Sequence, residues 1–230
     1  MAKIRKILSA GKLTIETIYP APKPRDSYAA RQGRKNVTSQ AMQMLNKRYA
    51  YQRLELQLAA NIFPGDFKVV LTYTPERLPT SREQVRKDLT SFFRKLRGRR
   101  GGGITYFYKI EHKHKAGNRY HIHIYMTGGP ESAKQLESVW GNGRVYCGPI
   151  EISQDETYEQ LARYMVKEAP DKLGQHLYDH SRHIRQPECD RLRVGDDTVL
   201  HPPDGCLVLN DTGQVDTVYG SFRTIKYMAI

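Results

Sequence analysis

The chain has 230 residues, of which 39% are hydrophobic, a size that suits one core with appendages better than two full domains. Its longest apolar runs, such as residues 56–63, are far shorter than the roughly 18 residues of a membrane span, and no signal-peptide pattern opens the chain, so we exclude membrane-spanning and secreted proteins and expect a cytoplasmic one. A formal net charge of +13 favours a partner with a phosphate backbone.

Composition and punctuation divide the chain into three parts. Residues 1–36 are basic and rich in proline near residue 20, which predicts an N-terminal arm without a core of its own. A helix is expected over 37–60, packed against a domain that extends to residue 190. Residues 191–230 read as a tail that packs on this domain, and the sequence beyond residue 170 is irregular, with at most one late strand pair.

The domain is expected to begin with a buried strand and a basic helix. Residues 67–74 are β-branched and aromatic, as in a buried strand, and Ser81 can cap a helix that ends in the glycines at 98 and 101–103. Arginines of this helix could contact phosphates, although a solvated helix face explains them equally well. The candidate DNA contacts are Arg94, Arg97, Arg99, Arg100 and, on the next strand, Lys113.

A β-hairpin follows, with strands over 104–114 and 120–127. On a strand, side chains two residues apart point the same way, so His121 and His123 can reach one cation. A three-residue turn places Glu111 opposite His121, whereas a two-residue turn places His112 there; Gly117 favours the first. A carboxylate and two imidazoles make an open site for a divalent cation, although two histidines in a strand are weak evidence alone.

A short helix over 131–140, a strand over 144–152 and a helix over 156–169 come next. In the last helix Tyr158 belongs to the buried stripe, and Tyr164 lies on the flank of that stripe. Lys167 is three residues further on and therefore beside Tyr164, where its charge could favour the phenolate. A surface tyrosine and lysine would show the same spacing.

Together these motifs resemble the HUH endonucleases, specifically the rolling-circle replication initiators of phages and plasmids. The sequence Leu71-Thr-Tyr-Thr-Pro75 looks like the family's first strand motif, Glu111 with His121-Ile-His123 looks like its metal site, and Tyr164-Met-Val-Lys167 looks like its nucleophile motif. The tyrosine follows the histidine pair, as in replication initiators, whereas it precedes the pair in conjugative relaxases. Segments 61–66, 140–143 and 181–187 are also similar, so the resemblance covers about 37–190.

The resemblance implies an α+β fold with a central antiparallel sheet of the ferredoxin or RRM-like kind, flanked by helices. It implies that Glu111, His121 and His123 bind Mg²⁺ or Mn²⁺, that Tyr164 attacks the DNA, and that Lys167 positions the tyrosine or balances its charge. The reaction would nick a single-stranded or hairpin origin, leaving a 5′-phosphotyrosine and a free 3′-hydroxyl.

Two features depart from the family's pattern or limit it. Two-tyrosine members place their nucleophiles four residues apart, but positions 160 and 168 hold Gln and Glu, which favours a single-tyrosine enzyme. The chain contains no Gly-x-x-x-x-Gly-Lys-Ser/Thr loop, so unwinding and synthesis would come from a helicase and a polymerase of the bacterial host. The alternatives are a single-strand DNA transposase of the same superfamily and a sheet-based nucleic-acid-binding module without catalysis.

Overall fold

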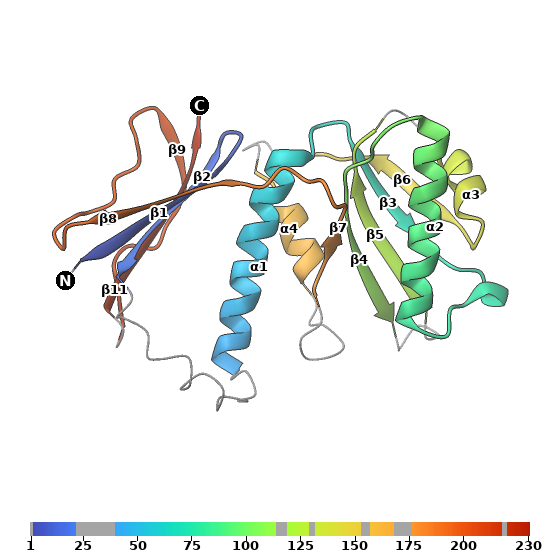
Figure 1. Ribbon diagram of the computed structural model, residues 1–230, viewed down its shortest axis with the longest axis horizontal. Helices are drawn as coiled ribbons and strands as arrows, with labels where there is room; N and C mark the ends of the chain where they lie inside the picture. The colour runs from blue at the N-terminus through green and yellow to red at the C-terminus, as the bar shows by residue number, and fades with distance from the viewer. Residues whose placement is uncertain are drawn as a thin grey trace. The chain divides into compact units, whose positions relative to one another are not determined.

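The computed structural model describes residues 2–21, 40–113, 119–128, 132–152, 157–167, 176–217 and 220–230. These residues form four α-helices and two antiparallel sheets, which confirms the expected α+β class (Figure 1). The chain divides into a central unit, Asn61–Arg185, and a terminal unit made of Met1–Ala60 and Gln186–Ile230. Among the described helices, none is long and apolar enough to cross a membrane.

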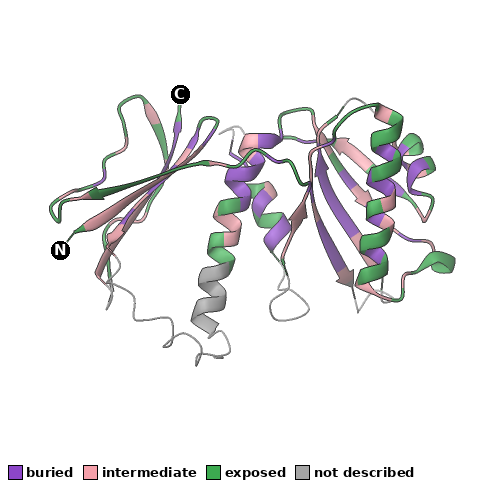
Figure 2. Ribbon diagram, in the orientation of Figure 1, coloured by how far each residue is buried: buried purple, intermediate pink, exposed green. Residues whose placement is uncertain are grey.

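The central unit is built on a five-stranded antiparallel sheet with the strand order β6-β3-β5-β4-β7. Its strands are β3 (Phe67–Leu71), β4 (Tyr106–Lys113), β5 (Arg119–Met126), β6 (Val145–Pro149) and β7 (Asp179–His180). The predicted hairpin is therefore present as β4 and β5, while the strand predicted over 67–74 ends at Leu71 and leads into the short 3₁₀ helix η2 (Pro75–Arg77). Figure 2 shows how much of β4 and β5 is buried.

Two helices, α2 (Arg82–Arg100) and α3 (Ala133–Trp140), pack against one face of this sheet. Ser81 caps α2 as predicted, because its side chain accepts a hydrogen bond from the backbone N–H of Gln84. The helix continues through Gly98 and ends at Gly101, which has the left-handed backbone conformation of a C-cap. The apolar stripe of α2 packs on Ile122, Ile124 and other core residues, and burial of each such side chain contributes about 1.5–3 kcal/mol.

The fourth helix, α4 (Glu159–Val166), lies on the opposite face of the sheet from α2 (Figure 1). Tyr158 precedes it and is buried, as predicted, with its hydroxyl donating to the backbone carbonyl of Ile62. Ala162 and Met165 are also buried, which anchors the inner side of α4 on the domain. The helix is shorter than the predicted 156–169, and the predicted cap at Asp155 falls outside the described residues.

The terminal unit has its own six-stranded antiparallel sheet, with the order β10-β11-β2-β1-β8 and β9 paired to β11. Its strands are β1 (Lys3–Ala10), β2 (Leu13–Pro20), β8 (Glu188–Val194), β9 (Cys206–Asp211), β10 (Val215–Thr217) and β11 (Gly220–Ala229). The helix α1 (Gln40–Asn61) packs on one face through Leu56. A buried ion pair, Lys226 to Glu55 at 2.5 Å, also joins sheet and helix.

This unit differs from the predicted division of the chain. The parts expected to be a basic arm over 1–36 and a tail over 191–230 form one sheet together, in which β1 pairs with β8 and β2 pairs with β11. Helix α1 packs with them, so a domain over 37–190 is not what the described residues form. The reason is physical: each strand is short, and its pairing partner lies about two hundred residues away, so local patterns carry no signal of the shared core.

Candidate active site

The register of the central hairpin determines which side chains share a face with the histidines. Glu111 lies directly opposite His121, as the three-residue turn predicts, and Lys109 lies opposite His123. The turn itself falls outside the described residues. His112 pairs with Tyr120 and stacks on its ring with centroids 4.1 Å apart, so it belongs to the alternate set of positions on the hairpin. The structure therefore favours Glu111 over His112 as the companion of His121 and His123.

Three of the predicted residues form a chain of hydrogen bonds. Nε2 of His123 lies 3.0 Å from Oε2 of Glu111, and Nδ1 of His123 lies 3.0 Å from the hydroxyl of Tyr164. An ionised carboxylate can only accept, so Nε2–H donates to Glu111 and Nδ1 accepts from the Tyr164 hydroxyl. Glu111 and His123 are buried, whereas Tyr164 is 38% exposed and open to a substrate.

The environment favours a neutral His123. Burial is the largest influence and lowers its pKa; the charges of Lys109 and His121 lower it further, while the hydrogen bond to Glu111 acts in the opposite direction. A neutral imidazole has one nitrogen free of hydrogen, and here that nitrogen faces Tyr164. His123 can therefore orient the phenol and accept its proton.

A second tyrosine on the same sheet face is ruled out by its surroundings. Tyr125 is almost fully buried, and its hydroxyl is 3.5 Å from the backbone carbonyl of Leu161. Burial and the neighbouring Tyr164 raise the pKa of Tyr125 well above its usual value, so it stays protonated. Tyr164 is thus the tyrosine of this face that combines exposure with a hydrogen-bonding base.

Two lysines that the motif search missed lie at the nucleophile candidate. Nζ of Lys68 is 5.1 Å and Nζ of Lys109 is 5.8 Å from the centroid of the Tyr164 ring. Lys68 comes from β3 and Lys109, which is buried, from β4. The period of two along each strand could have found them: Lys109 precedes Glu111 by two residues, and Lys68 precedes Val70, the partner of His123, by two.

His121 lines a cavity of about 510 Å³ beside this cluster. Two arginines, Arg119 and Arg144, and the exposed Tyr146 also line it, which gives it a cationic and aromatic wall. These three residues were not among the predicted DNA contacts. The other lining residues are Val70, Thr72, Tyr73, Thr74, Pro75 and Tyr120.

The donor atoms suit a divalent cation in part. A buried carboxylate beside imidazoles is a donor set that Mn²⁺ and Mg²⁺ accept, and Glu111 and His123 are already in contact. His121 shares their face, but within the described part of the chain no three His, Cys, Asp or Glu side chains are gathered closely enough to hold a metal. Binding of an ion would therefore require the hydrogen bond between Glu111 and His123 to open.

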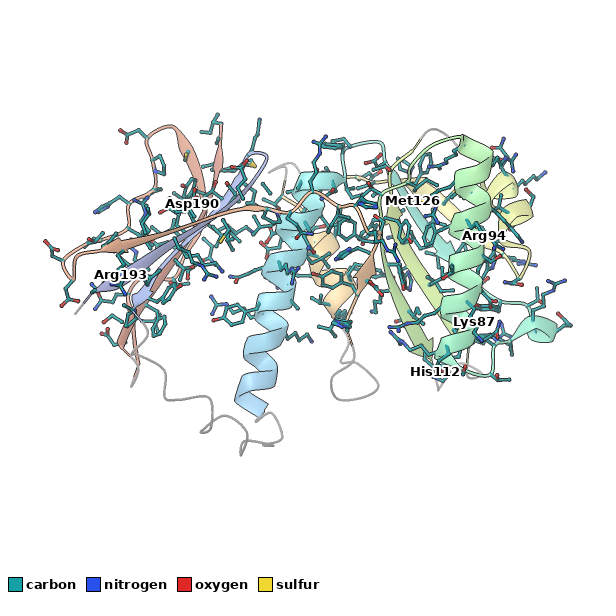
Figure 3. All side chains as sticks on the ribbon, viewed as in Figure 1. Lys87, Arg94, His112, Met126, Asp190 and Arg193 are labelled. Carbon is teal, nitrogen blue, oxygen red and sulfur yellow. The ribbon has the colours of Figure 1, made fainter. Side chains whose placement is uncertain are left out.

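The remaining predicted site residues lie elsewhere. Lys167 directly follows α4 and is exposed, one turn beyond Tyr164. Arg94, Arg97 and Arg99 are exposed on α2, which packs against the sheet face opposite to His123 (Figure 3). Arg100 is half-buried and donates to the carbonyl of Thr127. Lys113 ends β4, and its side chain falls outside the described residues.

Comparison with known proteins supports a role in DNA replication. Residues 66–169 match a family of replication-associated proteins of the ORF2 type, a segment that contains the whole hydrogen-bonded cluster but fewer than half of the chain's residues. Searches of curated proteins and of solved structures give no significant match.

Proposed function

We propose that the protein is a site-specific single-stranded DNA endonuclease and strand transferase that initiates rolling-circle replication. The proposal is supported above all by one observation, the hydrogen bond between the Tyr164 hydroxyl and a His123 ring that is held by Glu111. The family match over 66–169 supports the replication context. Both come from the central unit, so the chemistry is assigned to that unit.

In this reaction the oxygen of Tyr164 attacks the scissile phosphorus. The new Tyr–O–P bond forms as the bond from phosphorus to the 3′-oxygen breaks, which leaves a 5′-phosphotyrosine and a 3′-hydroxyl. Nδ1 of His123 holds the phenol and accepts its proton, and Lys68 and Lys109 stabilise the negative charge that develops on the phenol oxygen and phosphate. The ester preserves the energy of the broken bond, so a later 3′-hydroxyl can reverse the reaction.

Glu111, His121 and His123 would hold Mg²⁺ or Mn²⁺. Such an ion supplies charge neutralisation at the non-bridging oxygens of the phosphate. The DNA strand would approach through the cavity beside His121, where Arg119 and Arg144 bind phosphates and Tyr146 stacks on a base. Lys167, exposed after Tyr164, would add a phosphate contact. A host helicase would open the origin, and a host polymerase would extend the 3′-hydroxyl.

End-labelled DNA tests this function, because the polarity of the adduct is part of the proposal. Single-stranded oligonucleotides tiling the candidate origin are incubated with the protein and Mn²⁺ and resolved on denaturing gels. We expect a 3′-end label to migrate with the protein and a 5′-end label to be released on a shorter fragment. Tyr164→Phe should abolish the adduct, while Tyr125→Phe, a change at the buried neighbour, should retain it.

Two results would contradict the proposal. An adduct in Tyr164→Phe equal to that of the wild type would reject the nucleophile. Tight oligonucleotide binding with no cleavage across all tiles and both metals would instead indicate a binding module without catalysis.

A further inference from the structure

The six-stranded sheet of the terminal unit separates its charges by face. Side chains that are directly opposite in an antiparallel pair point to the same side, so the registers assign every strand residue to a face. The face toward α1 carries Leu8, Leu13 and Ile15, which pack with Leu56 of the helix. All acidic residues in the described strands of this sheet lie on the other face. They are Glu16, Glu188, Asp190, Asp211 and Asp216.

Basic residues on that outer face are neutralised locally. Arg5 pairs with Glu16 at 2.7 Å, and Arg223 pairs with Asp211 at 2.7 Å. Lys3, at the end of β1, pairs with Asp196. This face is therefore compensated in charge and offers little attraction to a polyanion.

The face toward α1 is cationic instead. Lys6 lies opposite Arg191, and Arg193 is two residues further along β8 on the same side, while Asp190 takes the other (Figure 3). Arg53 of α1 faces the same space. None of these four cations has a carboxylate partner within the described residues. Lys226, the remaining cation of this face, is neutralised by the buried Glu55.

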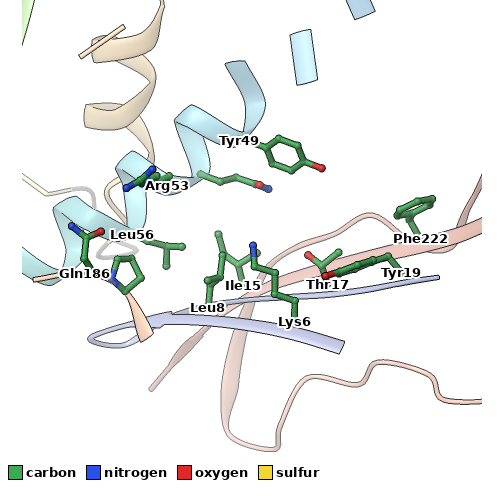
Figure 4. Close-up of a pocket in the computed structure, with 12 residues that line it drawn as sticks. Lys6, Leu8, Ile15, Thr17, Tyr19, Tyr49, Arg53, Leu56, Gln186 and Phe222 are labelled. Atoms are coloured by element: carbon green, nitrogen blue, oxygen red, sulfur yellow. The ribbon is translucent and has the colours of Figure 1, made fainter. Parts of the chain in front are cut away.

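A cavity of about 660 Å³ opens between α1 and this cationic face (Figure 4). Three aromatic residues line it: Tyr19 and Phe222 from the sheet and Tyr49 from the helix, the last 58% exposed. The amides of Gln52 and Gln186 and the cations of Lys6 and Arg53 complete the polar part of the wall. The volume is in the range of pockets that hold small organic groups.

We infer that this cavity binds a stretch of single-stranded DNA, as a second DNA site apart from the nicking cluster of the central unit. Unpaired cations match the phosphate backbone, and exposed aromatic rings match bases that are not stacked in a duplex. Amide side chains can bond the edges of such bases. The choice of DNA among polyanions rests on the proposed function, whereas the charge and the rings of the cavity do not.

A charge reversal on each face of the sheet tests the electrostatic part. Binding of the full-length protein to a fluorescein-labelled 12-nucleotide strand is followed by anisotropy over a series of salt concentrations. Arg191→Glu should weaken binding at least fivefold and reduce the slope of log K against log salt by about 0.7, the contribution of one phosphate contact. Lys3→Glu makes the same change in net charge on the outer face and should bind within twofold of the wild type.

A pair of substitutions at Tyr49 tests the stacking part. Tyr49→Ala should weaken binding about fivefold or more, since loss of one stacked base is worth at least 1 kcal/mol. Tyr49→Phe keeps the ring and should bind like the wild type. Because Tyr49 and Arg191 are exposed, thermal unfolding curves should be unchanged in all these variants.

The outcomes separate this inference from the proposed function. If Arg191→Glu and Lys3→Glu bind the strand equally, or if Tyr49→Ala binds as well as the wild type, the cavity is not a DNA site. A preference for a duplex of the same sequence would also overturn it. Adduct formation at Tyr164 is scored in a separate assay, so loss of nicking with intact cavity binding would reject the proposed function alone.

Discussion

The hydroxyl of Tyr164 and Nδ1 of His123 lie 3.0 Å apart, although forty-one residues separate them in the chain. The contact joins a helix to the central strand of a sheet. Glu111 fixes the other nitrogen of the ring from the neighbouring strand, so the position of the phenol is set by two strands and a helix. A nucleophile held in this way loses little freedom when its substrate binds, which lowers the entropic part of the barrier.

Replacement of His123 should separate catalysis from binding. We expect His123→Ala to reduce single-turnover adduct formation at least about a hundredfold, because general base groups contribute at least that much. His112→Ala, in the same hairpin but stacked on Tyr120 at an alternate position, should change the rate less than threefold. Equal rates in the two variants would show that the Tyr164–His123 contact has no part in the reaction.

Lys109 is expected to contribute through its charge. Lys109→Met preserves the length of this buried side chain and removes the cation 5.8 Å from the Tyr164 ring. A cation at such a distance from an aromatic ring is worth about 1–2 kcal/mol, so the rate of adduct formation should fall roughly tenfold. Lys87→Met on the exposed surface of α2 is the matched control and should react like the wild type.

Local patterns in the sequence were sufficient for the hairpin. The glycine at 117 favoured a three-residue turn, and that turn fixed Glu111 opposite His121, as found. Turn length and strand period act over a few residues, so they can be read without knowledge of the rest of the fold. The same holds for Ser81, whose capping of α2 depends on a residue only three positions away.

Contacts between distant elements were less accessible. Lys68 reaches Tyr164 only because β3 lies beside β5, and no motif marks that neighbour relation. The arginines of α2 were chosen for their density along the sequence, yet their helix covers the sheet face opposite to His123. The sheet formed by the two ends of the chain depends on pairing across nearly the full length, which periodicity cannot reveal.

Gly143 should be sensitive to the smallest side chain. A Cβ built at this position would lie 2.3 Å from the carbonyl oxygen of Thr72, which already accepts a hydrogen bond from Nε1 of Trp140. Gly143→Ala must therefore displace the start of β6 and with it Arg144, so we expect a loss of about 1–3 kcal/mol in the free energy of unfolding.

Gly148 offers the control, because a Cβ there would meet no atom within 4 Å. Gly148→Ala should unfold within about 0.5 kcal/mol of the wild type in urea titrations. If the two alanine variants were equally stable, the close approach at Thr72 would not constrain the fold.

The role of Glu111 can be assigned by an isosteric change combined with metal titration. Chelation should abolish adduct formation while leaving the unfolding temperature of the protein in place, if an ion serves the reaction. Glu111→Gln keeps an oxygen that can accept from Nε2 of His123, but it removes the negative charge that binds a cation. We therefore expect the Mn²⁺ concentration for half-maximal rate to rise at least tenfold, with much of the rate recovered at saturation. A residue that only orients His123 would behave differently: the Mn²⁺ dependence of Glu111→Gln would equal that of the wild type, and only the maximal rate would change.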